Sequence, residues 1–255
     1  MLTHGINGVP DDLEELGAAL RERGYATEFL TLPGHGTTIH DMARNGWEEW
    51  LEAVEDAADV ALAGEAEADG RPVFLVGHSL GAALTLAAAS RRPALGGVVA
   101  MCPPVRLAGS LEPAVGTLRR VTPFIPAWGE DIRDLKRRLM TRRGTYHWTP
   151  TSSLHSMLQA LPGLRLQLPE VTAPSLVITA RHDHVVPMRD AREAYELLGA
   201  EHKRLLVLER SYHAVARDVE RYTVFEQVAG FCDEVASAWP ARPSRPETLS
   251  EELSA

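Results

Sequence analysis

The sequence is poor in several features that would assign a protein class directly. It contains only two cysteines in 255 residues, Cys102 and Cys232, and they lie far apart. A small secreted disulfide scaffold needs more cysteines, and this pair matches no metal-ligand spacing, so we expect both to be buried apolar side chains. No apolar run reaches the ~18 residues that span a bilayer. Residues 1–4 contain no signal-peptide core, and the expected location is the cytoplasm.

Positive charge is also scarce. The chain has 26 Lys and Arg against 35 Asp and Glu, which gives a formal net charge of −9. Nucleic-acid binding usually requires a basic surface, so we expect no nucleic-acid partner. Hydrophobic residues make up 45% of the chain and charged residues 24%, as in an ordinary globular protein. Neither a heptad repeat nor a glycine period is present, which excludes coiled-coil and collagen-like structures.

Short apolar runs alternate with helical patterns along the chain. Two of the runs, residues 73–76 and 176–178, are continuously apolar, which is typical of parallel strands covered on both faces. The pattern predicts strands over residues 25–30, 73–77, 96–101, 175–180 and 203–208, with a sixth strand ending near residue 3. It predicts helices over residues 12–23, 47–68, 80–91, 188–198 and 219–239, the first of them capped by Asp11 with Glu14. This alternation indicates an α/β fold with a mostly parallel central sheet flanked by helices.

Residues 104–170 interrupt the alternation. They are rich in proline and show helical pieces but no convincing strand, so we expect a helical lid inserted over one end of the sheet. The prediction is one domain over residues 1–239 that contains this insertion. Residues 240–255 are rich in Pro, Ser and Glu, which is typical of a disordered tail.

The insertion is basic, although the whole chain is acidic. Residues 104–170 contain ten Lys and Arg and five Asp and Glu. Ile132, Leu135 and Leu139 would share one face of a basic amphipathic helix. In one interpretation this face covers a pocket and the charges are solvated. In the other, the charges attract an anionic substrate or make transient contact with a lipid surface.

The most informative motif is Gly77-His78-Ser79-Leu80-Gly81, which lies between a predicted strand and a predicted helix. A serine at such a tight turn is held in a strained backbone and exposed as a nucleophile, while the glycines let the turn close. The free N–H groups at the start of the following helix can stabilise an oxyanion.

A serine nucleophile needs a base that is oriented by a third group. Asp183 follows the predicted strand over residues 175–180, and His213 follows the one over residues 203–208. Both positions lie at the carboxyl edge of the sheet, together with Ser79. Glu209 and Asp218 are alternative acids, although Asp218 is more typical of a helix cap.

Several motifs together resemble the serine α/β-hydrolases, and in particular their bacterial carboxylesterase and monoacylglycerol lipase branch. The resemblance runs from His4 to about Trp239 and is weakest in the insertion. The residues that carry it are Gly77 to Gly81, His182-Asp183-His184-Val185-Val186-Pro187, Ser211-Tyr212-His213, His4-Gly5-Ile6-Asn7-Gly8, Leu32 to Thr38 and Trp47-Glu48-Glu49-Trp50.

This resemblance implies hydrolysis of a carboxylic ester through an acyl-enzyme, with no cofactor and no metal. It implies Ser79 as the nucleophile, His213 as the base and then the acid, and Asp183 as the orienting carboxylate. The backbone N–H groups of Ile6 and Leu80 would form the oxyanion hole. The implied substrates are short- or medium-chain acyl esters or monoacylglycerols.

Family members usually carry further residues before the His-Gly motif, whereas only three residues precede His4 in this sequence. We therefore expect either a start upstream of Met1 or a sheet without that edge.

The substrate pocket should be mainly apolar, since ligand pockets generally are. The residues that are candidates for its lining could instead simply pack the lid insertion against the rest of the domain. These candidates are Phe124, Ile125, Trp128, Leu154, Met157 and Leu158.

Three other functions fit the same residues. A thioesterase or a C–C bond hydrolase would use the same triad, and a non-catalytic receptor could bind a ligand in the same pocket. The sequence leaves the oligomeric state open.

Overall fold

The computed structural model describes residues 1–67, 70–127, 131–139 and 145–240. Its centre is a six-stranded sheet in which all neighbouring strands run parallel, in the order β2-β1-β3-β4-β7-β8. Its strands are β1 (Leu2–Thr3), β2 (Phe29–Leu30), β3 (Phe74–His78), β4 (Gly97–Met101), β7 (Ser175–Ala180) and β8 (Lys203–Leu208). A separate antiparallel pair is formed by β5 (Phe124–Pro126) and β6 (Trp148–Pro150).

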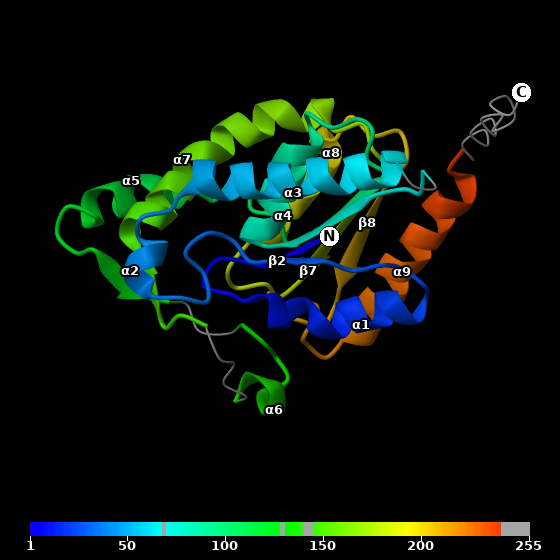
Figure 1. Ribbon diagram of the computed structural model, residues 1–255. Coiled ribbons are helices and arrows are strands. Elements are labelled where there is room, and N and C mark those ends of the chain that lie inside the picture. The colour runs from blue at the N-terminus through cyan, green and yellow to red at the C-terminus, as the bar shows by residue number, and fades with distance from the viewer. Residues whose placement is uncertain (68–69, 128–130, 140–144, 241–255) are drawn as a thin grey trace, which may run out of the picture.

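Helices lie on both faces of the central sheet (Figure 1). They are α1 (Glu14–Glu22), α2 (Ile39–Met42), α3 (Trp47–Glu67), α4 (Leu80–Ala89), α5 (Ala108–Leu118), α6 (Leu135–Arg138), α7 (Thr151–Gln167), α8 (Met188–Leu197) and α9 (Arg221–Ala238), with 3-10 turns at Pro10–Leu13 and Leu168–Glu170. One hydrophobic cluster joins α3, α4, α7 and α8 to the sheet, and a second joins α1 and α9 to its other face. The continuously apolar runs predicted as parallel strands are therefore β3 and β7, each covered on both faces.

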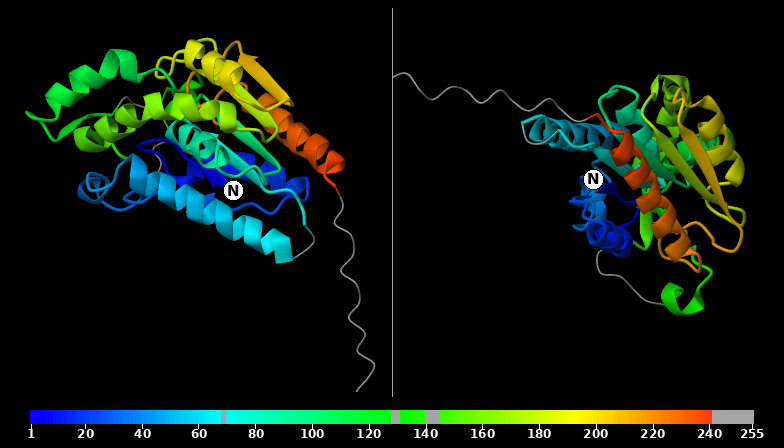
Figure 2. Two further views of the ribbon diagram at one scale, coloured as in Figure 1. Left: turned by 90° about the horizontal axis from the view of Figure 1, so that it is seen from above. Right: turned by 90° about the vertical axis from the view of Figure 1, so that its right-hand side faces the viewer.

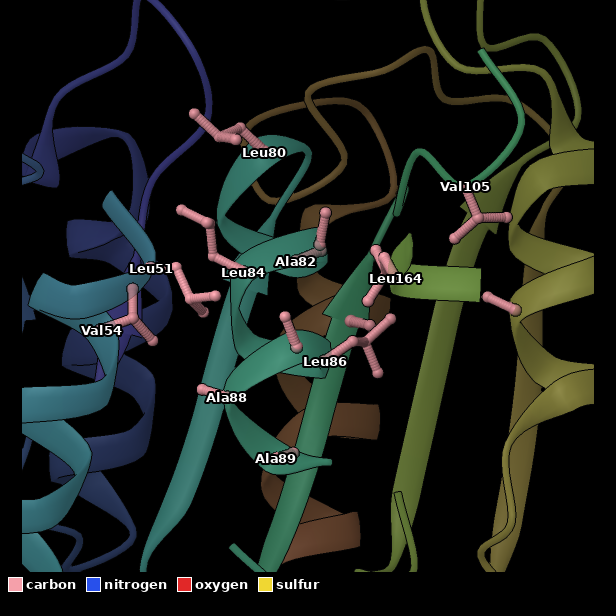
Figure 3. Packing of buried hydrophobic residues seen from close by; sticks show 14 of the residues in the cluster. Leu51, Val54, Leu80, Ala82, Leu84, Leu86, Ala88, Ala89, Val105 and Leu164 are labelled. Carbon is pink, nitrogen blue, oxygen red and sulfur yellow. The ribbon is translucent and has the colours of Figure 1, made fainter. Parts of the chain in front are cut away.

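Helix α4 is the most buried helix of the core. All ten of its residues are buried, and apart from Thr85 they are glycine, alanine and leucine. Figure 3 shows Leu84 of α4 close to Leu51 and Val54 of α3, all within one hydrophobic cluster. This packing fixes the first turn of α4, which directly follows Ser79.

The structure corrects three details of the sequence prediction. The strand expected over residues 25–30 is reduced to Phe29–Leu30. The first helix is not capped by Asp11, because a 3-10 turn comes first and the Asp12 carboxylate accepts the Val9 N–H at 3.0 Å. The insertion contains the strands β5 and β6, which the sequence did not indicate. Both strands have three residues and contain proline, so neither shows the alternation that reveals a strand.

The insertion also differs from the predicted amphipathic lid. Ile132 is fully buried, whereas Leu135 is 67% exposed and Leu139 75% exposed, so the three residues do not share a covered face. Helix α6 has only four residues and lies at the periphery of the fold (Figure 1; right view of Figure 2), where Arg137 binds Glu15 of α1 at 2.7 Å. Two of the basic residues in the insertion, Arg142 and Arg143, lie outside the described residues, as does the predicted tail beyond Pro240.

Across the ranges for which the structure gives coordinates, no helix combines the length and the hydropathy that a membrane crossing requires.

Candidate active site

Ser79 occupies a sharp turn between β3 and α4. It has φ 55° and ψ −119°, a backbone conformation that a side-chain-bearing residue rarely adopts. Two glycines allow the turn to close. A Cβ on Gly77 would lie 2.3 Å from the Gly81 carbonyl oxygen, and a Cβ on Gly81 would lie 2.3 Å from the Thr3 carbonyl oxygen. The strained turn is therefore built by close backbone contacts with α4 and β1.

The loop after β1 packs directly on this turn. A Cβ on Gly5 would lie 3.1 Å from the Ser79 Cβ, and Ile6 and Ser79 line the same cavity. Leu80 begins α4, where the first N–H groups lack helical partners. In the described part of the chain, neither the Ile6 N–H nor the Leu80 N–H has a hydrogen-bond partner. Within the described residues both predicted oxyanion donors thus have unused hydrogen-bonding capacity: Leu80 directly follows the serine, and Ile6 lies in the loop that packs on the serine turn.

His213 and Asp183 are hydrogen-bonded to each other. The His213 Nδ1 lies 2.7 Å from the Asp183 Oδ2, and the Asp183 side chain is fully buried. Burial alone raises the pKa of a carboxyl, but the His213 ring and the N–H groups of Val185 and Val186 together hold the pKa of Asp183 below its usual value. Because an ionised Asp183 can only accept, Nδ1 carries the proton and Nε2 of His213 is left free to act as a base.

The structure brings Ser79 and His213 to one cavity without a direct hydrogen bond between them among the described residues. The serine is 7% exposed and the histidine 8% exposed, and both line this cavity. Catalytic hydrogen bonds are often long in unliganded enzymes and shorten when the substrate binds.

The main-chain carbonyl of His213 is hydrogen-bonded by two side chains near the serine turn. His78 Nε2 donates to the His213 carbonyl oxygen at 3.0 Å, and the Cys102 thiol donates to the same oxygen at 3.4 Å. Burial and the neighbouring His213 lower the pKa of His78 to about 4, so His78 is neutral at physiological pH. His78, Cys102 and His213 offer ligand atoms within 4.8 Å of one another. The His78 Nε2 and the Cys102 thiol already donate to protein oxygen, so hydrogen bonding accounts for this group.

The alternative acids have other partners. The Glu209 carboxylate binds Arg181, with an oxygen 2.8 Å from the Arg181 Nη2. Asp218 is fully buried and accepts N–H groups from Tyr212 at 2.7 Å and from Arg133 at 2.9 Å. Neither carboxylate is hydrogen-bonded to His213, whereas Asp183 is.

A cavity of about 410 Å³ opens beside Ser79 and His213. This volume lies within the range of small-molecule sites. The lining combines apolar groups such as Val185 and Ala214 with polar and charged groups such as Asp131 and Arg138. The apolar part of its surface is the larger, as the sequence predicted. Asp131 was not recognised from the sequence, because a single acidic residue in an irregular segment gives no periodic or motif signal.

The predicted pocket residues that the structure describes do not line this cavity. Leu154, Met157 and Leu158 are buried on α7 in the cluster shared with α3 and α4, and none of them lines the cavity beside Ser79. Ile125 packs against the same cluster, and the Phe124 ring contacts His40 with ring centroids 5.3 Å apart. Trp128 lies outside the described residues. The structure thus assigns the first three to packing between the insertion and the body of the fold.

Fold and site together define a serine hydrolase with the α/β-hydrolase fold. The sheet is parallel, and the serine, histidine and carboxylate follow separate strands at its carboxyl edge. The chain belongs to the family described as serine aminopeptidase, S33, which matches residues 1–220.

Named relatives cover nearly the whole chain. A thermostable monoacylglycerol lipase from Bacillus sp. (strain H-257) is 26% identical over 231 residues, covering 91% of this chain and 88% of the lipase. A carboxylesterase from Bacillus subtilis (strain 168) is 25% identical over 235 residues and covers 92% of both proteins. A solved structure reported for the metagenome-derived lipolytic enzymes LipS and LipT superposes with a TM-score of 0.82 at 27% identity, covering 91% of this chain and 92% of that chain.

Proposed function

We propose that this protein hydrolyses carboxylic esters of small molecules through an acyl-enzyme on Ser79. The observation that carries the proposal is the 2.7 Å bond from the buried Asp183 to His213, which lines the same cavity as the strained Ser79. The named relatives, a monoacylglycerol lipase and a carboxylesterase, support esters as the substrate class.

In the proposed reaction His213 Nε2 takes the hydroxyl proton as Ser79 Oγ attacks the ester carbonyl carbon. The tetrahedral intermediate carries its negative charge on the former carbonyl oxygen, between the N–H groups of Ile6 and Leu80. Each such donor is worth about 3 kcal/mol of barrier. His213 then protonates the leaving alcohol. A water molecule, activated by the same ring, releases the acid and restores the serine. Asp183 keeps the ring in the tautomer that accepts the proton.

Short- or medium-chain acyl esters and monoacylglycerols are the proposed substrates. The names of two relatives, a monoacylglycerol lipase and a carboxylesterase, support carboxylic esters and monoacylglycerols, and the acyl length is the prediction made from the sequence. The cavity volume of about 410 Å³ has room for such an acyl group and a small alcohol. A cytoplasmic location and transient contact of the basic insertion with a lipid surface stay predictions from the sequence.

A panel of p-nitrophenyl esters of increasing acyl length tests this proposal. Ser79→Ala should lower kcat by about 10⁴-fold or more, because removal of a triad nucleophile leaves only binding and oxyanion contributions. A fluorophosphonate probe should label the wild-type chain at Ser79 and leave the variant unlabelled. Ser90→Ala is the matched control, since Ser90 follows the far end of α4 and its hydroxyl donates to the Ala87 carbonyl. Full activity in Ser79→Ala would refute the proposal.

A further inference from the structure

Asp131 lies where the insertion meets the two loops that carry the acid and the base. Its Oδ2 accepts the main-chain N–H of His213 at 3.1 Å and that of His184 at 3.1 Å. Its Oδ1 lies 2.8 Å from the His184 Nδ1, and its carbonyl oxygen accepts the Ala214 N–H at 3.1 Å. One residue of the insertion therefore binds both loops.

The two main-chain N–H groups lie beyond the sheet, because β7 ends at Ala180 and β8 at Leu208. The Asp131 carboxylate takes the place of a strand partner for both of them. Its side chain is 15% exposed and lines the cavity beside Ser79. A main-chain N–H that loses its acceptor in such a partly buried place is costly, so the loops would have to rearrange.

These contacts close a ring of bonded groups around the acid–base pair. Asp131 binds the His184 main chain, the neighbouring Asp183 binds the His213 ring, and the His213 main chain binds back to Asp131. On the other side of the same residue, His78 and Cys102 hold the His213 carbonyl oxygen. The peptide groups on both sides of His213 are thus tied by side chains, and only Asp131 among these comes from the insertion.

We propose that Asp131 is a positioning residue for the acid–base pair, acting through the main-chain N–H groups of His184 and His213. The inference rests on the proposed function, because it assigns Asp131 a role in the same ester hydrolysis. Misplacement of a reacting group by about 1 Å can cost a hundredfold in rate. Loss of the acceptor should therefore slow turnover while the binding of a neutral ester changes little.

Three variants of the full chain test this role, with kcat and KM measured on p-nitrophenyl butyrate. Asp131→Ala should lower kcat by about 10- to 100-fold with KM within about threefold of the wild type. Asp131→Asn should restore kcat to within about fivefold, because its amide oxygen can accept the same two N–H groups. Asp134→Ala is the matched control. The Asp134 carboxylate accepts the Lys136 N–H at 3.1 Å and the Arg137 N–H at 3.3 Å within α6, so kcat should stay within about twofold.

A low-field proton resonance from the bond between Asp183 and His213 gives a second readout. It should broaden in Asp131→Ala and stay sharp in Asp131→Asn and Asp134→Ala. Thermal unfolding shows which variants are folded. If Asp131→Ala does not fold, Asp131→Ser, which keeps one acceptor oxygen, should show an intermediate loss of kcat.

The positioning role is overturned if kcat of Asp131→Ala, or of Asp131→Ser in its place, equals that of the wild type. It is also overturned if Asp134→Ala lowers kcat as much as Asp131→Ala does, or if Asp131→Ala raises KM and leaves kcat unchanged. A slow Asp131→Asn with normal folding would also overturn it. Ser79→Ala, measured beside these variants, separates the two proposals. Activity in Ser79→Ala refutes the proposed function, whereas an inactive Ser79→Ala with a fast Asp131→Ala refutes only the role of Asp131.

Discussion

Replacement of Gly81 by alanine tests whether close backbone packing builds the serine turn. The added Cβ would lie 2.3 Å from the Thr3 carbonyl oxygen and 2.5 Å from the His4 carbonyl oxygen. An ordinary contact of this kind is at least ~3.4 Å, so the backbones of α4 and β1 must separate by about 1 Å. Neither neighbour is a flexible side chain, and both elements are packed in the core.

Such overpacking costs about 3 kcal/mol of unfolding free energy, at the upper end of the usual range. For a chain of this size the thermal midpoint should fall by about 6–12 °C. The same separation moves the Ile6 and Leu80 N–H groups relative to Ser79. We therefore expect kcat to fall by about 10²-fold in Gly81→Ala, beyond any loss of folded protein.

Gly230→Ala is the matched control, because Gly230 also lies in a helix, α9, but beyond the adjacent backbone of that helix its Cβ would meet no atom within 4 Å. Alanine is the better helix former, so this variant should gain about 0.5–1 kcal/mol with unchanged kcat. Thermal unfolding by circular dichroism and initial rates on p-nitrophenyl butyrate measure both effects. A Gly81→Ala variant as stable and as active as Gly230→Ala would refute the packing argument.

Two further predictions follow from buried groups. Burial lowers the pKa of His35 to about 3. Between about pH 6.5 and pH 3 the His35 imidazole is therefore protonated in the unfolded chain but stays neutral in the folded chain. The contribution of His35 to the unfolding free energy should be complete above this range and be lost as the pH falls through it. In urea unfolding, His35→Asn should reduce the slope of the unfolding free energy against pH by about 1.4 kcal/mol per pH unit. An unchanged slope would contradict this prediction. Burial also raises the pKa of the Cys102 thiol and raises that of Cys232 to about 12. Both thiols should react with a disulfide reagent only after unfolding in urea, and prompt reaction of the native chain would argue against their burial.

Local sequence patterns predicted the central architecture well. The continuous apolar runs at β3 and β7 and the alternation with helices indicated a parallel sheet, because these signals arise from nearest neighbours and from burial on both faces. The placement of Ser79, Asp183 and His213 at one sheet edge also followed from the sequence, since each residue comes directly after a predicted strand. The structure adds that Asp183, rather than Glu209 or Asp218, lies 2.7 Å from the His213 ring.

The strands of the insertion and the role of its apolar residues could be assigned only from the tertiary structure. Strands β5 and β6 are short and pair across a long stretch of chain, so no local pattern reveals them. Leu154 and Leu158 are apolar enough for either a ligand pocket or a core, and only their packing against α3 and α4 decides between the two.

The amino-acid sequence by itself determined the sheet, its flanking helices and the residues that can carry the chemistry, because backbone periodicity and turn geometry are local properties. Only the tertiary structure decided which groups surround them: the cavity, the burial of the predicted pocket residues, and the bonds from Asp131 to the loops of His184 and His213. Contacts between side chains and main-chain groups far apart in the sequence depend on how the elements pack, and no spacing along the chain encodes them.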